Sequence, residues 1–168
     1  MAGLSSVLQG YPRNIGGYAF EFVTPPAALE ILRRGRALHL GGNQLTHIPA
    51  FAKDSQHVTD DDRKHLVEII QSHPTFKKIL ITHGTDTMIE TAKFLRTQSS
   101  LQDRIIVLTG SMTPAVFRDS DADFNIGMAW SAVQSLKEPG AYLAIQGIVA
   151  NVENVERNLE TGQFLINP

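Results

Sequence analysis

The sequence of 168 residues contains no cysteine. Disulfide bonds, a thiol nucleophile and a thiolate metal site are therefore excluded, and the composition fits a reducing compartment. We expect the cytoplasm, with the mitochondrion as the alternative because residues 1–20 carry no acidic side chain; Arg13 is their only charge, however, whereas a transit peptide should be rich in arginine. No apolar run approaches the roughly 20 residues that a transmembrane helix requires.

Charge of one sign and aromatic residues are also scarce. The chain has 15 Lys and Arg against 17 Asp and Glu, a net charge of −2, and only 7% aromatic residues. Nucleic-acid-binding proteins carry a basic surface, often with aromatic stacking platforms, so we expect no nucleic-acid partner and no anionic membrane surface. With 42% hydrophobic residues, the chain can build the core of one domain.

Apolar runs alternate with amphipathic segments along the chain. We expect helices at residues 25–35, 58–73, 86–97 and 121–137, and strands at 46–51, 77–84, 104–110 and 141–150. Apolar strands separated by amphipathic helices predict the α/β class, with a doubly wound, mainly parallel sheet that has helices on both faces. Pro49 places its strand at an edge or ends it early. In such folds, ligands bind at the carboxyl ends of the strands.

The segment "ITHGTDTMIE", residues 81–90, places Thr85 and Asp86 directly after an apolar run. One interpretation is structural: Thr87 and Glu90 have the spacing of a capping box, and Asp86 complements the helix dipole. That interpretation gives no role to Thr85. A threonine beside a carboxylate at a ligand-binding edge can orient and polarise a hydroxyl, so both residues are also candidates for chemistry.

The acidic residues and histidines do not have a metal-binding spacing. Asp119, Asp121 and Asp123 alternate as in a calcium loop, but Phe124 and Trp130 stand where that loop requires a glycine and a bidentate glutamate. The start of a helix with acids in its first turn explains this segment better. The six histidines never form an HExxH motif. We therefore expect no metal ion.

Three stretches resemble the bacterial-type L-asparaginases, a family of threonine amidohydrolases. They are "KDSQHVTDDDR", "ITHGTDTMIETAKFL" and "VLTGSMTPAVFRDSDADFNIG". The resemblance runs from about Tyr11 to Phe164 and matches the family's amino-terminal domain. We therefore expect an atypical segment at residues 1–10 and an asparaginase-like α/β domain at 11–168. The resemblance implies hydrolysis of the side-chain amide of L-asparagine or a similar small amide, without a metal or organic cofactor.

The resemblance implies roles for five residues. Thr85 and Asp86 resemble the family's "TDT" motif, in which the threonine helps to activate the attacking group and the aspartate binds the substrate's α-ammonium group. Ser55 and Gln56 resemble the pair that holds the substrate's α-carboxylate and amine. Ser111 lies where the family offers a backbone carbonyl near the leaving amide.

Two catalytic positions of the family are not matched. The family's nucleophile is the last threonine of "TGGTI", a motif that this sequence does not contain. Counting back from Tyr11 places Ser6 near that position, with Leu4 and Ser5 where the family has glycines that let the substrate approach the backbone. Arg157 stands where the family has a catalytic lysine, and arginine stays charged and cannot accept a proton.

The apolar strand that precedes "TGGTI" in the family is not evident either. Within residues 1–10, only Val7 and Leu8 are adjacent apolar residues of strand type. We therefore expect that this segment does not form a well-paired central strand, and that neighbouring strands offer edges to other chains. Two functions remain open. One is an asparaginase-like amidohydrolase with weak activity that works as a homo-oligomer. The other is a catalytically dead relative, acting as a structural or interaction subunit of a larger assembly.

Overall fold

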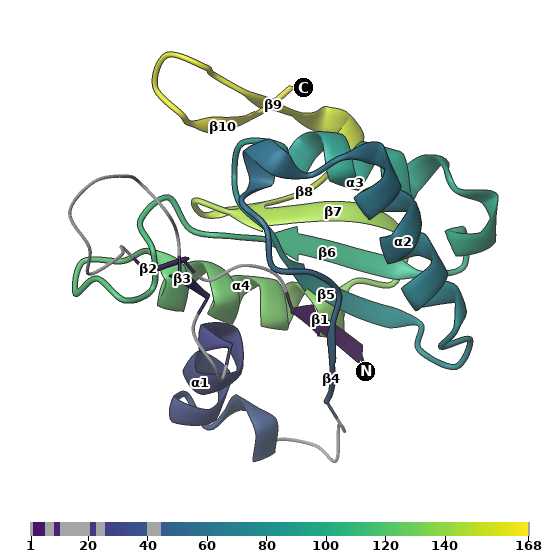
Figure 1. Cartoon of the computed structure of the whole chain (residues 1–168), viewed down its shortest axis with the longest axis horizontal. Helices are drawn as coiled ribbons and strands as arrows, with labels where there is room; N and C mark the ends of the chain where they lie inside the picture. The colour runs from purple at the N-terminus through teal and green to yellow at the C-terminus, as the bar shows by residue number, and fades with distance from the viewer. Residues whose placement is uncertain (1, 6–8, 11–20, 23–25, 40–44, 168) are drawn as a thin grey trace.

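The computed structural model describes residues 2–5, 9–10, 21–22, 26–39 and 45–167. A six-stranded sheet in the order β4-β1-β5-β6-β7-β8 forms its centre (Figure 1). These strands are β1 (Ala2–Ser5), β4 (Thr46–Pro49), β5 (Lys78–Thr82), β6 (Ile105–Thr109), β7 (Gly140–Ile145) and β8 (Ile148–Asn151). Every neighbouring pair is parallel except β7 with β8, which confirms the predicted mainly parallel α/β fold.

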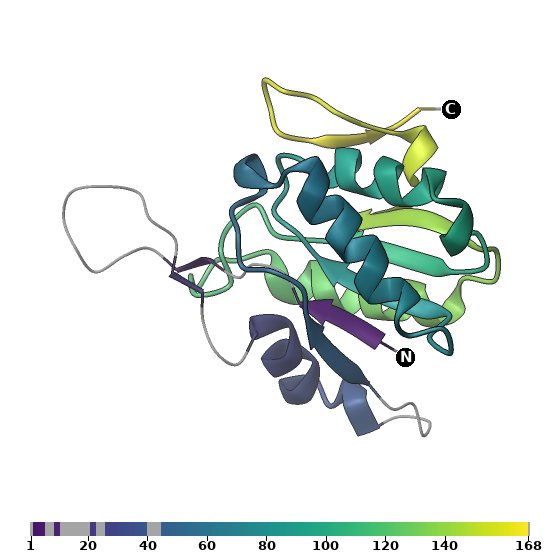
Figure 2. The ribbon, with the colours of Figure 1, turned by 45° about the vertical axis from the view of Figure 1, so that its right-hand side comes forward.

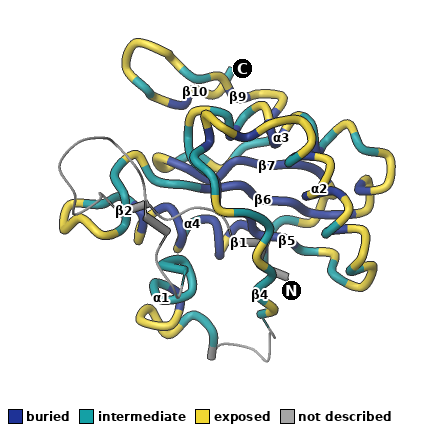
Figure 3. Tube along the Cα trace, in the orientation of Figure 1, coloured by how far each residue is buried: buried dark blue, intermediate teal, exposed yellow. Residues whose placement is uncertain are grey.

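Helices cover both faces of the sheet (Figure 2). They are α1 (Ala27–Arg34), α2 (Asp60–Gln71), α3 (Met88–Thr97) and α4 (Ala122–Ser135). Along β6, Ile106 and Leu108 pack into a core with α2 and α3, whereas Ile105 and Val107 pack into a second core with α1 and α4. Successive strand residues point to opposite faces, so β6 is buried on both sides (Figure 3). In the described part of the chain, no helix is long and apolar enough to cross a membrane.

Short elements complete the described structure. The 3₁₀ turns are η1 (Ala37–His39), η2 (Ser55–His57), η3 (Ser99–Leu101) and η4 (Val152–Asn154). Two small antiparallel pairs join β2 (Gln9–Gly10) with β3 (Glu21–Phe22) and β9 (Val155–Arg157) with β10 (Phe164–Ile166). Val155 and Phe164 belong to the core on the side of α2 and α3, which fixes the β9–β10 hairpin to that side of the sheet.

Strand β1 corrects the expectation that residues 1–10 would not form a well-paired central strand. Ala2–Ser5 pair in parallel with β4, and residues 2–4 pair with β5 on the other side. The first strand is thus present, and β4 and β5 both pair with it. The sequence pattern was misleading because a sheet ladder uses backbone N–H and C=O groups, which almost every residue carries, so a short strand does not require a long apolar run.

The single strand expected at residues 141–150 is in fact two strands. β7 and β8 form an antiparallel hairpin, and Gln146 and Gly147 at its turn have φ values of 51° and 84°. Positive φ at both positions is typical of a type I′ turn, which matches the twist of the strands. The buried Asn125 side chain stabilises the turn, because its Oδ1 accepts a hydrogen bond of 3.0 Å from the Gln146 backbone N–H. The continuous apolar run concealed this turn.

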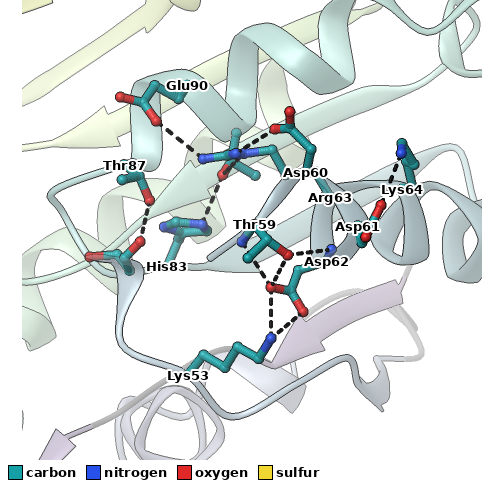
Figure 4. Close-up of polar contacts among 12 residues, drawn as sticks. Lys53, Thr59, Asp60, Asp61, Asp62, Arg63, Lys64, His83, Thr87 and Glu90 are labelled. Atoms are coloured by element: carbon teal, nitrogen blue, oxygen red, sulfur yellow. Dashed lines mark hydrogen bonds and ion pairs between the residues drawn. The ribbon is translucent and has the colours of Figure 1, made fainter. Parts of the chain in front are cut away.

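The predicted helix boundaries agree with the structure to within two residues. The capping box expected from the sequence at the start of α2 is present. Thr59 Oγ1 accepts a hydrogen bond from the Asp62 backbone N–H, and an Asp62 oxygen accepts one from the Thr59 N–H. Lys53 Nζ also donates to both Asp62 oxygens, at 2.6 and 2.8 Å (Figure 4). Burial raises the pKa of Asp62, but hydrogen bonds from Lys53 and Thr59 outweigh it and lower this pKa to about 2.

Candidate functional site

Four of the candidate residues meet at the carboxyl end of β5. Thr85 and Asp86 lie in the turn between β5 and α3, whereas Ser55 and Gln56 lie in η2, after β4. Gln56 Nε2 donates a hydrogen bond of 2.7 Å to Asp86 Oδ2. The Asp86 backbone N–H donates one of 3.3 Å to Ser55 Oγ. Because β4 and β5 run in the same direction on either side of β1, their carboxyl ends meet at one edge, and the expected proximity is confirmed.

These residues differ in their exposure to solvent. Ser55 is only 3% exposed, so it supports Asp86 from within the protein. Gln56 and Asp86 are exposed, and Thr85 is half-buried. The Thr85 hydroxyl has no hydrogen-bond partner within the described ranges. The surface that a ligand could reach is therefore formed by the Gln56 amide, the Asp86 carboxylate and the Thr85 hydroxyl, while the roles of these groups in binding stay predictions.

Arg157 joins the cluster from β9. Its Nη1 donates hydrogen bonds to Asp86 Oδ1 at 2.8 Å and to the Thr85 backbone oxygen at 3.1 Å. The guanidinium carbon lies 5.7 Å from the centroid of the Phe164 ring, within cation–π range. The hydrogen bond from Arg157 lowers the pKa of Asp86; burial opposes this effect and the Gln56 amide adds to it. Asp86 is therefore a stabilised anion, and each of its oxygens already has one partner.

The capping box predicted at Thr87 and Glu90 is wrong. Thr87 begins α3 without a side-chain cap, and its Oγ1 instead donates a hydrogen bond of 2.7 Å to the Ser55 backbone oxygen. Glu90 pairs with Arg63 Nη2 of α2 at 3.2 Å (Figure 4). Both side chains have partners on other segments, which local spacing could not reveal. Thr87 is thus a site residue that sequence analysis missed.

Gly84 lets the two segments of the site pack closely. A Cβ atom at this position would lie 2.6 Å from Ser55 Oγ and 2.7 Å from Ser55 Cβ. Real Cβ atoms do not approach other heavy atoms so closely, so any larger residue would displace Ser55. The contact explains the need for glycine between His83 and Thr85 at this strand end.

The remaining candidates are not part of this hydrogen-bonded cluster. Ser111 follows β6 at the same edge and is half-buried, but in the part of the chain that the structure describes no hydrogen bond joins it to the cluster. Ser6 lies outside the described residues. Asp121 stabilises the loop before α4, where its carboxylate accepts hydrogen bonds from the backbone N–H groups of Met112 and Thr113. Within the described ranges, no group of three or more acidic or histidine side chains could hold a metal ion.

Comparison with known proteins gives consistent matches. The family described as "Asparaginase, N-terminal" matches residues 27–162. The chain is 30% identical over 128 residues to the glutaminase-asparaginase of Acinetobacter glutaminasificans, which is 72% of this chain and 38% of that protein. It is 34% identical over 74 residues to L-asparaginase 1 of Escherichia coli (strain K12), which is 44% of this chain and 22% of that protein.

Solved structures of asparaginases share the fold. The probable cytoplasmic L-asparaginase from Campylobacter jejuni matches with a TM-score of 0.76 at 22% identity, covering 97% of this chain and 52% of that one. The thermostable L-asparaginase from Thermococcus kodakarensis matches with a TM-score of 0.72 at 23% identity, covering 99% of this chain and 51% of that one. The chain therefore spans about half the length of these structures.

Proposed function

The chain belongs to the asparaginase family, through a match to its amino-terminal domain, and we propose that it binds L-asparagine or a similar small amide. The proposed binding site is the cluster of Ser55, Gln56, Thr85 and Asp86. The observation that carries the proposal is the hydrogen bond of 2.7 Å between Gln56 and Asp86, which joins motifs from two strand ends into one polar site. An amino acid's ammonium and carboxylate groups match the Asp86 anion and the Gln56 amide donor.

Asp86 can accept an ammonium group in addition to its present partners. A carboxylate offers about four lone-pair directions, and Arg157 and Gln56 each use one of them. The side chain of Asp86 is 39% exposed, and its lowered pKa keeps it charged near neutral pH. A ligand's α-ammonium group would add a charge-assisted hydrogen bond, which is stronger than one between neutral groups.

We propose that hydrolysis of the side-chain amide is slow. Arg157 occupies the position of the family's lysine and stays protonated, so it cannot remove a proton from the Thr85 hydroxyl or from water. Its Nη1 is used instead to bind Asp86 and the Thr85 backbone oxygen. Loss of a single catalytic group typically lowers turnover by several orders of magnitude.

Two measurements on the purified protein test this function. Calorimetry with L-asparagine and L-aspartate measures binding, and ammonia release from L-asparagine and L-glutamine measures turnover. We expect measurable binding and turnover far below that of a family member with intact "TGGT". Asp86→Asn should abolish binding, whereas Asp119→Asn, which changes an exposed carboxylate in another loop, should not. Binding that Asp86→Asn leaves unchanged would contradict the proposal.

The ion pair of Asp86 with Arg157 favours a second function, that of a catalytically dead subunit in a homo-oligomer or larger assembly. With no ligand bound, this pair already neutralises Asp86 and ties the β9–β10 hairpin to the β5–α3 turn. A structural role predicts that Asp86→Asn lowers the melting temperature and that neither amino acid raises it. Size-exclusion chromatography and recovery of the native protein from cells would then show an assembly.

A further inference from the structure

A buried chain of hydrogen bonds runs from α2 to the turn that carries the candidate site. Arg63 Nε donates to Thr91 Oγ1 at 3.1 Å, and Thr91 Oγ1 lies 3.0 Å from His83 Nε2. His83 Nδ1 lies 2.7 Å from the Gly84 carbonyl oxygen. Thr91 is 0% exposed, His83 2% and Arg63 7%, so the chain is closed to solvent (Figure 4). Gly84 directly precedes Thr85 and Asp86.

The chemistry of these groups fixes where the protons lie. A carbonyl oxygen only accepts hydrogen bonds, so His83 Nδ1 carries a proton and donates it to Gly84. Burial lowers the pKa of His83 to about 4, a shift that the Gly84 hydrogen bond opposes and the charge of Arg63 supports. The ring is therefore neutral, and its Nε2 accepts from the Thr91 hydroxyl. The hydroxyl in turn accepts from Arg63.

Arg63 anchors the far end of this chain. Its Nη1 pairs with Asp60 of α2 at 2.8 Å, and its Nη2 pairs with Glu90 of α3 at 3.2 Å. Arginine stays protonated and its guanidinium is planar, so Nε remains a donor of fixed direction. The donor order from Arg63 through Thr91 and His83 to Gly84 is therefore the same throughout.

We propose that Thr91 and His83 are positioning residues for the ligand site, because together they fix the peptide between Gly84 and Thr85. The orientation of this peptide sets the directions of the Thr85 and Asp86 side chains. Without the Thr91 hydroxyl, His83 Nε2 loses its donor, and the tautomer with a proton on Nε2 becomes accessible. In that tautomer Nδ1 no longer donates to Gly84. The effect on ligand binding rests on the proposed function, whereas the effect on the turn does not.

Thr91→Val tests the proposal, because it removes the hydroxyl and keeps the shape of the side chain. Thr91→Ser keeps the hydroxyl. Thr97→Val is the matched control on the same helix, where an exposed threonine hydroxyl donates 2.8 Å to the Phe94 carbonyl oxygen. Three readouts are needed: the ¹⁵N signals of the His83 ring, hydrogen exchange of the Asp86 backbone amide, and the Kd for L-aspartate.

We expect one tautomer, protonated on Nδ1, in the wild type and a mixture in Thr91→Val. In that variant the Asp86 amide should exchange about tenfold faster, and the Kd should rise about tenfold, as loss of a buried hydrogen bond predicts. Thr91→Ser and Thr97→Val should resemble the wild type. A Thr91→Val protein with an unchanged His83 tautomer and unchanged Asp86 exchange would overturn the proposal.

Two further outcomes remain decisive. Should Thr91→Val fail to fold, His83→Asn and His83→Leu replace it. The asparagine amide keeps a donor near the position of Nδ1, so slow Asp86 exchange is expected in His83→Asn and fast exchange in His83→Leu. Equal exchange in both would overturn the proposal. A wild type that binds neither L-aspartate nor L-asparagine would refute the proposed function, while the tautomer and the amide exchange would still decide the positioning role.

Discussion

The hydroxyl of Thr87 donates a hydrogen bond of 2.7 Å to the backbone carbonyl oxygen of Ser55, which lies 32 positions earlier in the chain. This contact holds the segment after β4 against the turn after β5. The Asp86 backbone N–H makes a second contact with the same residue, through Ser55 Oγ. The two halves of the candidate site are therefore held together by contacts to Ser55 as well as by the Gln56–Asp86 hydrogen bond.

Thr87→Val should weaken ligand binding. It removes the donor to the Ser55 carbonyl oxygen, and we expect the Kd for L-aspartate to rise several-fold and the free energy of unfolding to fall by about 1 kcal/mol. Calorimetry and urea denaturation measure these changes. Thr87→Ser keeps the hydroxyl and should behave as the wild type. Equal Kd values for the valine and serine variants would show that this contact does not shape the site.

Gly84→Ala should damage the site more than a glycine substitution elsewhere. The new Cβ would lie 2.6 Å from Ser55 Oγ, so we expect a loss of about 1–3 kcal/mol in unfolding free energy and a clear loss of binding. Gly127→Ala is the matched control, because a Cβ on this exposed position of α4 would have no heavy atom within 4 Å. That change should stabilise the helix by up to about 1 kcal/mol. Similar melting temperatures for the two variants would argue against the close packing.

Arg157→Lys should raise ammonia release from L-asparagine. A lysine can lose its proton when its surroundings tune its pKa, whereas the guanidinium cannot. We expect an increase of at least several-fold, together with a new basic limb in the pH profile of turnover. Arg118→Lys, an exposed position in the loop before α4, serves as the control. Turnover that stays at the wild-type level would show that the missing base does not limit the reaction.

The stability of the protein should fall between pH 6.5 and 4 because of His83. Burial lowers the pKa of this residue from 6.5 to about 4 in the folded state, so the unfolded chain binds the extra proton first as the pH falls. Within this window the free energy of unfolding should decrease by about 1.4 kcal/mol per pH unit, with no contribution above it and a constant loss below it.

Urea denaturation at pH 7, 6 and 5 measures this slope. His83→Asn should remove the contribution of His83. His65→Asn removes an exposed histidine of α2 and serves as the control. A His83→Asn protein with the same pH slope as the control would contradict the assignment of this slope to the buried ring.

The sequence by itself determined the elements and their layering. Helix boundaries, the capping box of Thr59 and Asp62 and the edge position of the Pro49 strand follow from residues within one or two turns of each other. Periodicity and capping are local effects, so a single sequence reveals them. The expectation that strand ends would bring Ser55 and Asp86 together followed from the parallel order of the strands.

Only the tertiary structure decided which partners these residues choose. Thr87 and Glu90 have the spacing of a capping box, yet they bind Ser55 and Arg63. Arg157 reaches Asp86 across 71 positions. A side-chain hydrogen bond to a local backbone group and one to a distant segment are similar in free energy, at about 1 kcal/mol each. The choice between them is made when the hydrophobic core brings distant segments into contact, and this information is not contained in local spacing.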